Sequence, residues 1–105
     1  DLSDWDRESL QISKYSEGEY YKIHQDFTPE KYVTRKLSLT VQLSDDNDYE
    51  GGDLVFHNLP DKKTSVRGKG SVIVFDSRLF HEITPVIKGT RYSLVKWYHG
   101  DEPLK

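Results

Sequence analysis

The ten residues 35–44, RKLSLTVQLS, carry the pattern that decides the fold. Apolar residues occupy every second position of this stretch: Leu37, Leu39, Val41 and Leu43. Polar residues lie between them, including Ser38, Thr40 and Gln42. Because successive side chains of a strand point to opposite faces, the alternation predicts a β-strand with one apolar and one polar face.

Shorter runs rich in β-branched and aromatic residues predict further strands on both sides of this one. We expect them at residues 10–15, 20–25, 54–57, 71–75 and 90–98. Glycine- and proline-containing turns separate these runs, and neither alanine nor methionine occurs in the chain. Many short strands at regular intervals predict a mainly β protein with little helix, arranged as a sandwich or barrel.

Length and charge limit what the chain can be. With 105 residues it is large enough for one hydrophobic core but not for two, so we expect a single domain. The net charge is −3 and no basic run is present, which argues against nucleic acid as a partner. No apolar stretch approaches the ~18 residues of a membrane span. The chain also begins without a signal peptide and without Met, so we interpret it as a fragment of a cytoplasmic protein.

The absence of cysteine excludes disulfides, thiolate metal sites and a cysteine nucleophile, so a bound metal would need histidine or carboxylate ligands. His24 and Asp26 are two positions apart, which places both side chains on one face of a strand. A third, distant imidazole would complete a triad of two histidines and one carboxylate, leaving three adjacent coordination positions free. His81 is our candidate; the alternative is a strand-end histidine bonded to backbone.

Arg91 and Ser93 repeat this spacing near the C-terminus of the chain. On a strand, their guanidinium and hydroxyl groups point the same way and form a clamp for a carboxylate. The alternative is that Arg91 forms an ordinary ion pair with an acidic residue at the surface.

Four segments extend these pairs into longer patterns. They read Tyr15-x-x-Gly18-x-x-Tyr21-x-x-His24-x-Asp26, Arg35-x-x-Ser38-x-Thr40-x-x-Leu43-Ser44, Asp48-Tyr49-Glu50-Gly51-Gly52-Asp53-Leu54, and Phe75-Asp76-Ser77-x-x-Phe80-His81-Glu82-x-x-Pro85-Val86-x-x-Gly89-x-Arg91-Tyr92-Ser93. In order and spacing they resemble the iron(II)/2-oxoglutarate-dependent dioxygenases, in the branch of the prolyl 4-hydroxylases and the bacterial PKHD-type hydroxylases. The resemblance extends from about residue 10 to residue 97, most of the chain.

The resemblance implies a double-stranded β-helix, which is a jelly roll or cupin-like barrel that encloses a metal. It implies that His24, Asp26 and His81 bind Fe(II). Arg91 matches the basic residue that pairs with the distal carboxylate of 2-oxoglutarate, a position that many prolyl hydroxylases fill with lysine. Beside that carboxylate we expect three further residues: Ser93, Tyr15 and Gln42. Leu54 and Trp97 are expected to form apolar walls of the site. For Trp97, the alternative is packing in the core.

The implied activity is hydroxylation of a C–H bond, with O2 consumed and succinate and CO2 released. A peptide or protein proline is the expected substrate and a small molecule the second choice, with ascorbate as the reductant. Trp97 stands where the nucleic-acid demethylating branch typically has a second arginine, so that branch fits less well. Two alternatives stay open: a non-catalytic jelly-roll module that binds a metal or ligand, and an inactive fragment.

The resemblance also gives the alternating strand an orientation. Its serine, threonine and glutamine would face the cosubstrate, and its leucines would face outward. Family members usually cover this outer face with N-terminal helices, which residues 1–105 lack. We therefore expect a single catalytic core with either an exposed apolar sheet face or a partner that covers it.

Overall fold

The structure, a computed structural model, describes residues 5–30, 32–58 and 67–101. The strands are β1 (Gln11–Tyr15), β2 (Tyr21–His24), β3 (Arg35–Gln42), β4 (Tyr49–Gly51), β5 (Leu54–Phe56), β6 (Val72–Asp76), β7 (His81–Ile83), β8 (Val86–Gly89) and β9 (Arg91–His99). A short 3-10 helix, η2 (Asp46–Asp48), precedes β4. Among the described residues, no helix has the length and apolarity needed to cross a membrane.

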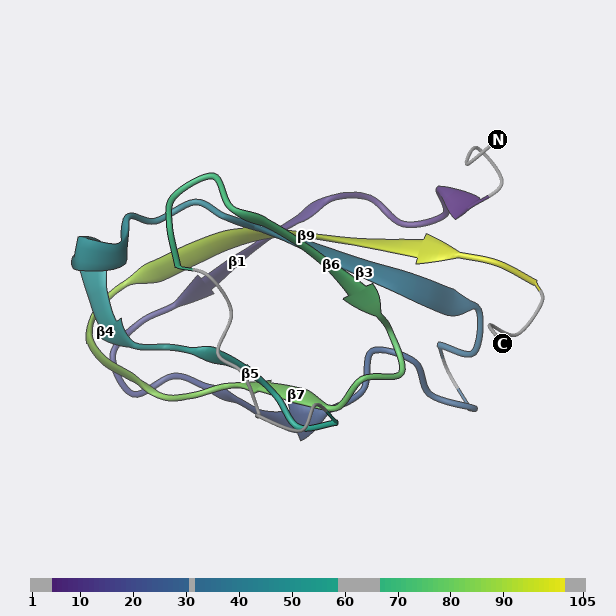
Figure 1. The fold of residues 1–105 in the computed structure, drawn as a ribbon, viewed down its shortest axis with the longest axis horizontal. Coiled ribbons are helices and arrows are strands. Elements are labelled where there is room, and N and C mark those ends of the chain that lie inside the picture. The colour runs from purple at the N-terminus through teal and green to yellow at the C-terminus, as the bar shows by residue number, and fades with distance from the viewer. Residues whose placement is uncertain (1–4, 31, 59–66, 102–105) are drawn as a thin grey trace.

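The strands alternate between two layers that face each other (Figure 1). The upper layer in this view is a four-stranded sheet in the order β1-β9-β3-β6, and the lower is a three-stranded sheet in the order β2-β7-β5. Strands β4 and β8 pair separately at one end, and all pairs are antiparallel. This is the predicted mainly β jelly roll with almost no helix.

The predicted strands are present within one or two residues of their expected bounds. Three strands were not predicted, namely β4, β7 and β8. Each has only three or four residues. A run of that length shows no periodicity of its own, and the glycines and the Thr84-Pro85 pair around these strands read as turns.

The polar face of β3 points into the molecule, as predicted. Ser38 and Gln42 are 1% and 4% exposed, whereas Leu39 and Val41 on the other face are half-buried. On the outer face of the sheet, the leucines of β3 itself are half-buried. The exposed apolar side chains of this face lie on the two edge strands: Ile12, Val72 and Val74, at 70%, 59% and 56% exposure.

The space between the two sheets is only partly filled by a hydrophobic core. Leu54, Phe56 and Ile83 form the buried cluster, with Tyr15 and Phe75 among the half-buried residues packed against it. Among the described residues, buried polar and charged side chains outnumber buried hydrophobic ones. Because burying a polar group is unfavourable unless it is hydrogen-bonded, such an interior indicates a functional site rather than a plain core.

Candidate metal centre

The pairing of β2 with β7 brings two of the predicted metal ligands together. His24 and His81 are register partners across this strand pair, and their ring centroids are 4.3 Å apart. The register is irregular between Tyr21 and His24, as at a β-bulge. This irregularity lets Tyr21 line the same cavity as His24, three residues later, and the two rings stack at 3.8 Å.

Backbone carbonyls fix the orientation of both imidazoles. Nδ1 of His24 lies 2.7 Å from the carbonyl oxygen of Lys22, and Nδ1 of His81 lies 2.9 Å from that of Leu79. Because a carbonyl oxygen only accepts hydrogen bonds, each Nδ1 carries the proton. In the neutral form of each ring, Nε2 is then the atom with the lone pair that a metal needs, and it lies 3.4 Å (His24) or 3.3 Å (His81) from Oδ1 of Asp26.

Asp26 is oriented by two buried serines. The hydroxyl of Ser38 donates to Oδ2 at 2.6 Å, and the hydroxyl of Ser77 lies 2.9 Å from that of Ser38. Since Ser38 gives its only proton to the carboxylate, Ser77 must donate to Ser38. Burial raises the pKa of Asp26, but its contacts with His24 and His81 and the hydrogen bond from Ser38 outweigh burial and hold the pKa below its usual range.

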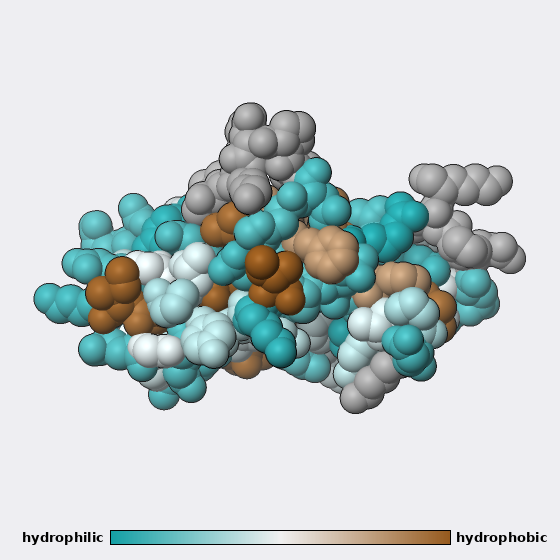
Figure 2. All heavy atoms as spheres, turned by 90° about the horizontal axis from the view of Figure 1, so that it is seen from below, coloured by the Kyte–Doolittle hydropathy of each residue, from teal (hydrophilic) through white to brown (hydrophobic). Residues whose placement is uncertain are grey.

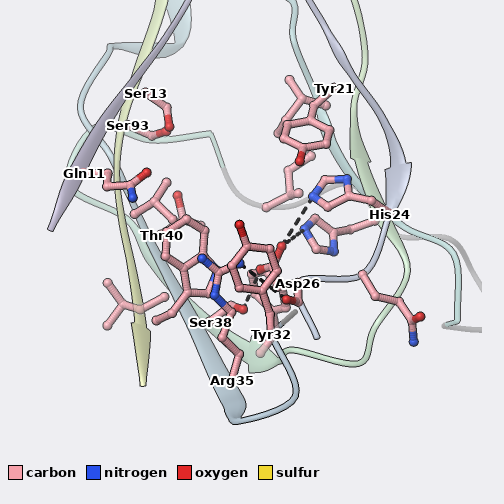
Figure 3. A pocket seen from close by; sticks show the side chains of 18 of the residues that line it. Gln11, Ser13, Tyr21, His24, Asp26, Tyr32, Arg35, Ser38, Thr40 and Ser93 are labelled. Carbon is pink, nitrogen blue, oxygen red and sulfur yellow. Dashed lines mark hydrogen bonds and ion pairs between the residues drawn. The ribbon is translucent and has the colours of Figure 1, made fainter. Parts of the chain in front are cut away.

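These three side chains fit a divalent metal. Their ligand atoms, two imidazole nitrogens and one carboxylate oxygen, lie within 4.8 Å of one another. His24 reaches the cluster from β2, in the right half of Figure 3, and Asp26 and Ser38 lie below it. A donor set of two neutral imidazoles and one carboxylate is the facial triad of non-haem Fe(II) sites. The second oxygen of Asp26 is occupied by Ser38, which favours coordination through one oxygen.

Arg91 lies in the same cavity and lacks a carboxylate partner among the described residues. It is 4% exposed, its Nε has no hydrogen-bond partner, and Nη1 donates to Ser93 Oγ at 3.3 Å. Its Cζ is 5.9 Å from the centroid of the Tyr15 ring. Burial raises the pKa of Tyr15, so its hydroxyl is protonated at neutral pH and can donate a hydrogen bond. A buried guanidinium without an anion is unfavourable, which indicates a missing ligand.

The cavity that joins the metal ligands to Arg91 has a volume of about 490 Å³. Side chains from both sheets point into it, with Ser13, Ser93 and Thr40 from the four-stranded sheet opposite His24 and Tyr21 (Figure 3). The predicted wall residues Leu54 and Trp97 line it too. The prediction for Gln42 does not match its contacts: this residue is buried outside the lining, and its amide donates to Tyr49 Oη at 2.6 Å.

Sequence reasoning assigned no role to Arg35 and Tyr32, which also line the cavity. The Arg35 guanidinium lies between two aromatic rings, with its Cζ 3.7 Å from the Tyr32 ring centroid and 3.8 Å from that of Trp97. Arg35 is the first residue of the alternating strand, but its partners come from three separate parts of the chain: Tyr32 before the strand, Trp97 on β9 and Glu8 before β1. No local pattern in the sequence signals such an arrangement.

Comparison with known proteins agrees with this geometry. The family model of the 2OG-Fe(II) oxygenase superfamily matches residues 10–99. A PKHD-type hydroxylase from Idiomarina loihiensis is 34% identical over 86 residues, which are 82% of this chain and 39% of that protein. One from Synechococcus sp. (strain CC9605) is 38% identical over 90 residues, 85% of this chain and 40% of that protein.

Among solved structures, a prolyl-4-hydroxylase from Pseudomonas putida is similar, with a TM-score of 0.73 and 26% identity. The match covers 86% of this chain and 51% of that one. The chain thus spans only about 40% of the length of the curated relatives named above. The match to the family model nevertheless includes both sheets and all three candidate metal ligands. The chain therefore belongs to the 2OG-Fe(II) oxygenase superfamily.

Proposed function

We propose that this chain is the catalytic core of an Fe(II)- and 2-oxoglutarate-dependent dioxygenase that hydroxylates a C–H bond of a peptide or protein proline. Succinate and CO2 are the coproducts, and ascorbate serves as the reductant. When bound, the iron supplies the redox chemistry that couples decarboxylation of 2-oxoglutarate to hydroxylation. His24, Asp26 and His81 would hold the iron, which is the family's metal and suits their donor set.

The observation that carries the proposal is the buried guanidinium of Arg91. It shares a cavity with the metal ligands, has an Nε without a partner, and forms no ion pair with any described carboxylate. The distal carboxylate of 2-oxoglutarate would supply the missing anion in a planar, two-point contact. Ser93 already accepts a hydrogen bond from Arg91, so its hydroxyl proton is free to donate to the same carboxylate.

Tyr15 and the wall residues would complete the cosubstrate pocket. The protonated hydroxyl of Tyr15 is a donor beside Arg91, and Leu54 and Trp97 limit access of water to the space between the clamp and the metal ligands. In this proposal the protein chiefly positions the reactants and excludes competing reactions.

Proline is proposed as the substrate because relatives of this chain carry the names PKHD-type hydroxylase and prolyl-4-hydroxylase. A small molecule is the second candidate, and nucleic acid is not part of the proposal. A non-catalytic jelly-roll module is disfavoured, because a structural metal site has no use for an unpaired buried arginine in the same cavity.

Succinate release tests the proposal. Purified protein is incubated with Fe(II), ascorbate, 2-oxoglutarate and a set of proline-containing peptides, beside His81→Ala and Arg91→Ala. We expect succinate from the wild type, none from His81→Ala, and from Arg91→Ala a greatly increased requirement for 2-oxoglutarate. Lys14→Ala, an exposed cation on the outer side of β1, is the matched control for loss of charge. Equal succinate release by the wild type and His81→Ala would reject the proposal.

We further propose that the outer face of the four-stranded sheet is covered in the whole protein, by a segment outside these 105 residues or by a partner. The exposed Ile12 on one edge strand and the exposed Val72 and Val74 on the other support this, because exposed apolar side chains gathered on one sheet face favour an interface there. The opposite side of the molecule differs: Figure 2 shows apolar side chains there scattered among hydrophilic ones. A cytoplasmic location stays a prediction from the sequence.

A further inference from the structure

The cavity contains a second cation, and its charge is neutralised. Among the described lining residues, Arg35 and Arg91 are the two that carry a positive charge at every working pH. Arg91 has no carboxylate partner within the described part of the chain, whereas Arg35 pairs with Glu8 through two parallel hydrogen bonds. An entering ligand therefore meets a balanced charge at Arg35 and an unbalanced positive charge at Arg91.

The Arg35–Glu8 pair is geometrically well defined. Nε and Nη2 of Arg35 donate to Oε2 and Oε1 of Glu8, both at 2.8 Å, in the two-point geometry that makes arginine–carboxylate pairs strong. The third nitrogen, Nη1, is 3.4 Å from the backbone oxygen of Asp26. The guanidinium of Arg35 thus lies beside Asp26, one of the candidate metal ligands. Its charge is balanced by Glu8 through the other two nitrogens.

Glu8 is itself held by a second contact. His99 Nε2 lies 2.5 Å from Glu8 Oε2, and His99 Nδ1 lies 2.8 Å from the hydroxyl of Thr34. The hydrogen bonds from Arg35 lower the pKa of Glu8, so this carboxyl is ionised at neutral pH. Glu8 belongs to the segment before β1, and it reaches Arg35 across 27 positions of sequence.

We propose that Glu8 is a specificity-determining residue, which makes the part of the cavity lined by Tyr32, Arg35 and Trp97 electrically neutral and so rejects anionic substrates. With Arg35 balanced by Glu8, Arg91 is the one uncompensated cation among the described lining residues. The cavity then holds one dianion, the cosubstrate, at Arg91. The group that lies against the Tyr32–Arg35–Trp97 stack is uncharged, as in a peptide rather than a free carboxylic acid. This inference rests on the proposed function.

A purely structural role for the pair predicts something different. If Glu8 only fastened the N-terminal segment, its loss would loosen the fold without changing which charge the cavity prefers. Charge preference is therefore the property to measure, with a probe close to Arg35. Trp97 is such a probe, because its ring centroid lies 3.8 Å from the Arg35 guanidinium.

The first experiment compares quenching of Trp97 fluorescence by iodide, an anion, and by acrylamide, which is neutral. Trp5→Phe removes the only other tryptophan, since the chain contains two. In that background we expect Glu8→Gln to raise the iodide-to-acrylamide ratio of quenching constants about threefold or more at low ionic strength. Glu8→Asp, which keeps the charge, and Glu17→Gln, which removes an exposed one, should leave the ratio near that of the wild type.

A charge-reversed arm keeps the test decisive if Glu8→Gln does not fold. Arg35→Met removes the cation and leaves Glu8 unbalanced, so the iodide-to-acrylamide ratio should fall below that of the wild type. The double variant Glu8→Gln/Arg35→Met should return to it. An unchanged ratio in Glu8→Gln, or a ratio that rises in Arg35→Met, would overturn the inference.

The second experiment measures specificity directly, with a matched pair of probes that differ in charge. Mn(II)- and 2-oxoglutarate-loaded protein is titrated with N-acetylproline amide and with N-acetylproline. We expect the wild type to prefer the amide, and Glu8→Gln to shift the ratio of dissociation constants toward the acid by about tenfold. If the ratio does not shift, the inference about Glu8 is contradicted, but the proposed function is not. Failure of 2-oxoglutarate to bind the Mn(II)-loaded wild type contradicts the proposed function instead.

Discussion

Gly52 lies directly against Arg91. A Cβ atom on Gly52 would be 3.3 Å from Cδ of Arg91 and 3.0 Å from a methyl group of Val86, and the backbone there has a φ of +59°. Only glycine adopts this conformation without strain. The residue after β4 thus leaves room for the arginine on which the proposed cosubstrate site depends.

Gly52→Ala is therefore expected to weaken 2-oxoglutarate binding while sparing the metal ligands. The added methyl group crowds Arg91, and the left-handed backbone adds strain of about 1–2 kcal/mol. A loss of that size lowers the Tm of a domain of this size by roughly 4–15 °C. Titration of Mn(II)-loaded protein with 2-oxoglutarate measures the first effect, and thermal unfolding measures the second.

Gly18→Ala is the matched control, because Gly18 also has a positive φ, +85°, but no atom of the described residues lies within 4 Å of a Cβ added there. It should lose similar stability and keep wild-type affinity for 2-oxoglutarate. Equal loss of affinity in both variants would mean that backbone strain, not crowding of Arg91, is responsible.

Ser38→Ala tests the serine pair behind Asp26. Without the hydroxyl, Oδ2 loses its 2.6 Å hydrogen bond and the carboxylate is free to rotate. Loss of such an outer partner typically lowers metal affinity about 10- to 100-fold. Ser77→Ala should have a smaller effect, since Ser38 can still donate to Asp26. Calorimetric titration with Mn(II) measures both, and wild-type affinity in Ser38→Ala would contradict the assignment.

His81→Ala removes a metal ligand rather than its support. Its effect should exceed that of Ser38→Ala, with Mn(II) affinity reduced more than about 100-fold. His57→Ala is the control: this histidine pairs with Glu82 at 2.5 Å and does not line the cavity. If the two histidine variants bind Mn(II) equally well, the triad is not the metal site.

Acid should reveal the Arg35–Glu8 pair. The pKa of Glu8 is lowered in the folded protein, so its contribution to stability is fully present above the unfolded value of about 4.3. The contribution is lost as the pH falls through the lower folded pKa. Glu8→Gln lacks it at every pH, so the Tm difference from the wild type should be constant above about pH 5 and shrink in stronger acid. If the Tm difference between the wild type and Glu8→Gln grew as the pH was lowered, the expected direction of the effect would be contradicted.

The outer face of the four-stranded sheet predicts association of the isolated chain. Val74→Thr should reduce concentration-dependent self-association, seen by light scattering after size exclusion, because the side chain is 56% exposed on an edge strand. Its effect on stability should stay within about 0.5 kcal/mol. Ile87→Thr, 69% exposed but on β8, is the comparison and should change association less.

Much of the fold was predictable because β3 alternates from Lys36 to Gln42, and the burial of Ser38 and Gln42 follows that pattern. The structure also brings His24, Asp26 and His81 together, as the family motif implied. The short β7 was not predicted, because three residues give no periodic signal and its position depends on pairing with β2 and β5.

The contacts of single side chains were harder to foresee. Gln42 shares the inward face of β3 with Ser38, yet it bonds Tyr49 because the fold brings β4 to that end of the strand. The Arg35–Glu8 pair joins the start of β3 to the segment before β1. The sequence of neither segment contains a pattern that predicts contact with the other. Strand periodicity fixes the face of a residue but not its partner across the sandwich.

The division of the site between the two sheets has a thermodynamic consequence. His24 and His81 belong to the three-stranded sheet, whereas Arg91 and Ser93 belong to the four-stranded one. If the first pair held the metal and the second pair the cosubstrate, the bound groups would contact both layers, and few hydrophobic side chains are buried between these layers. Binding of either ligand should then make the sandwich more rigid. The metal should therefore increase the affinity for the cosubstrate, and the cosubstrate should increase the affinity for the metal by the same factor.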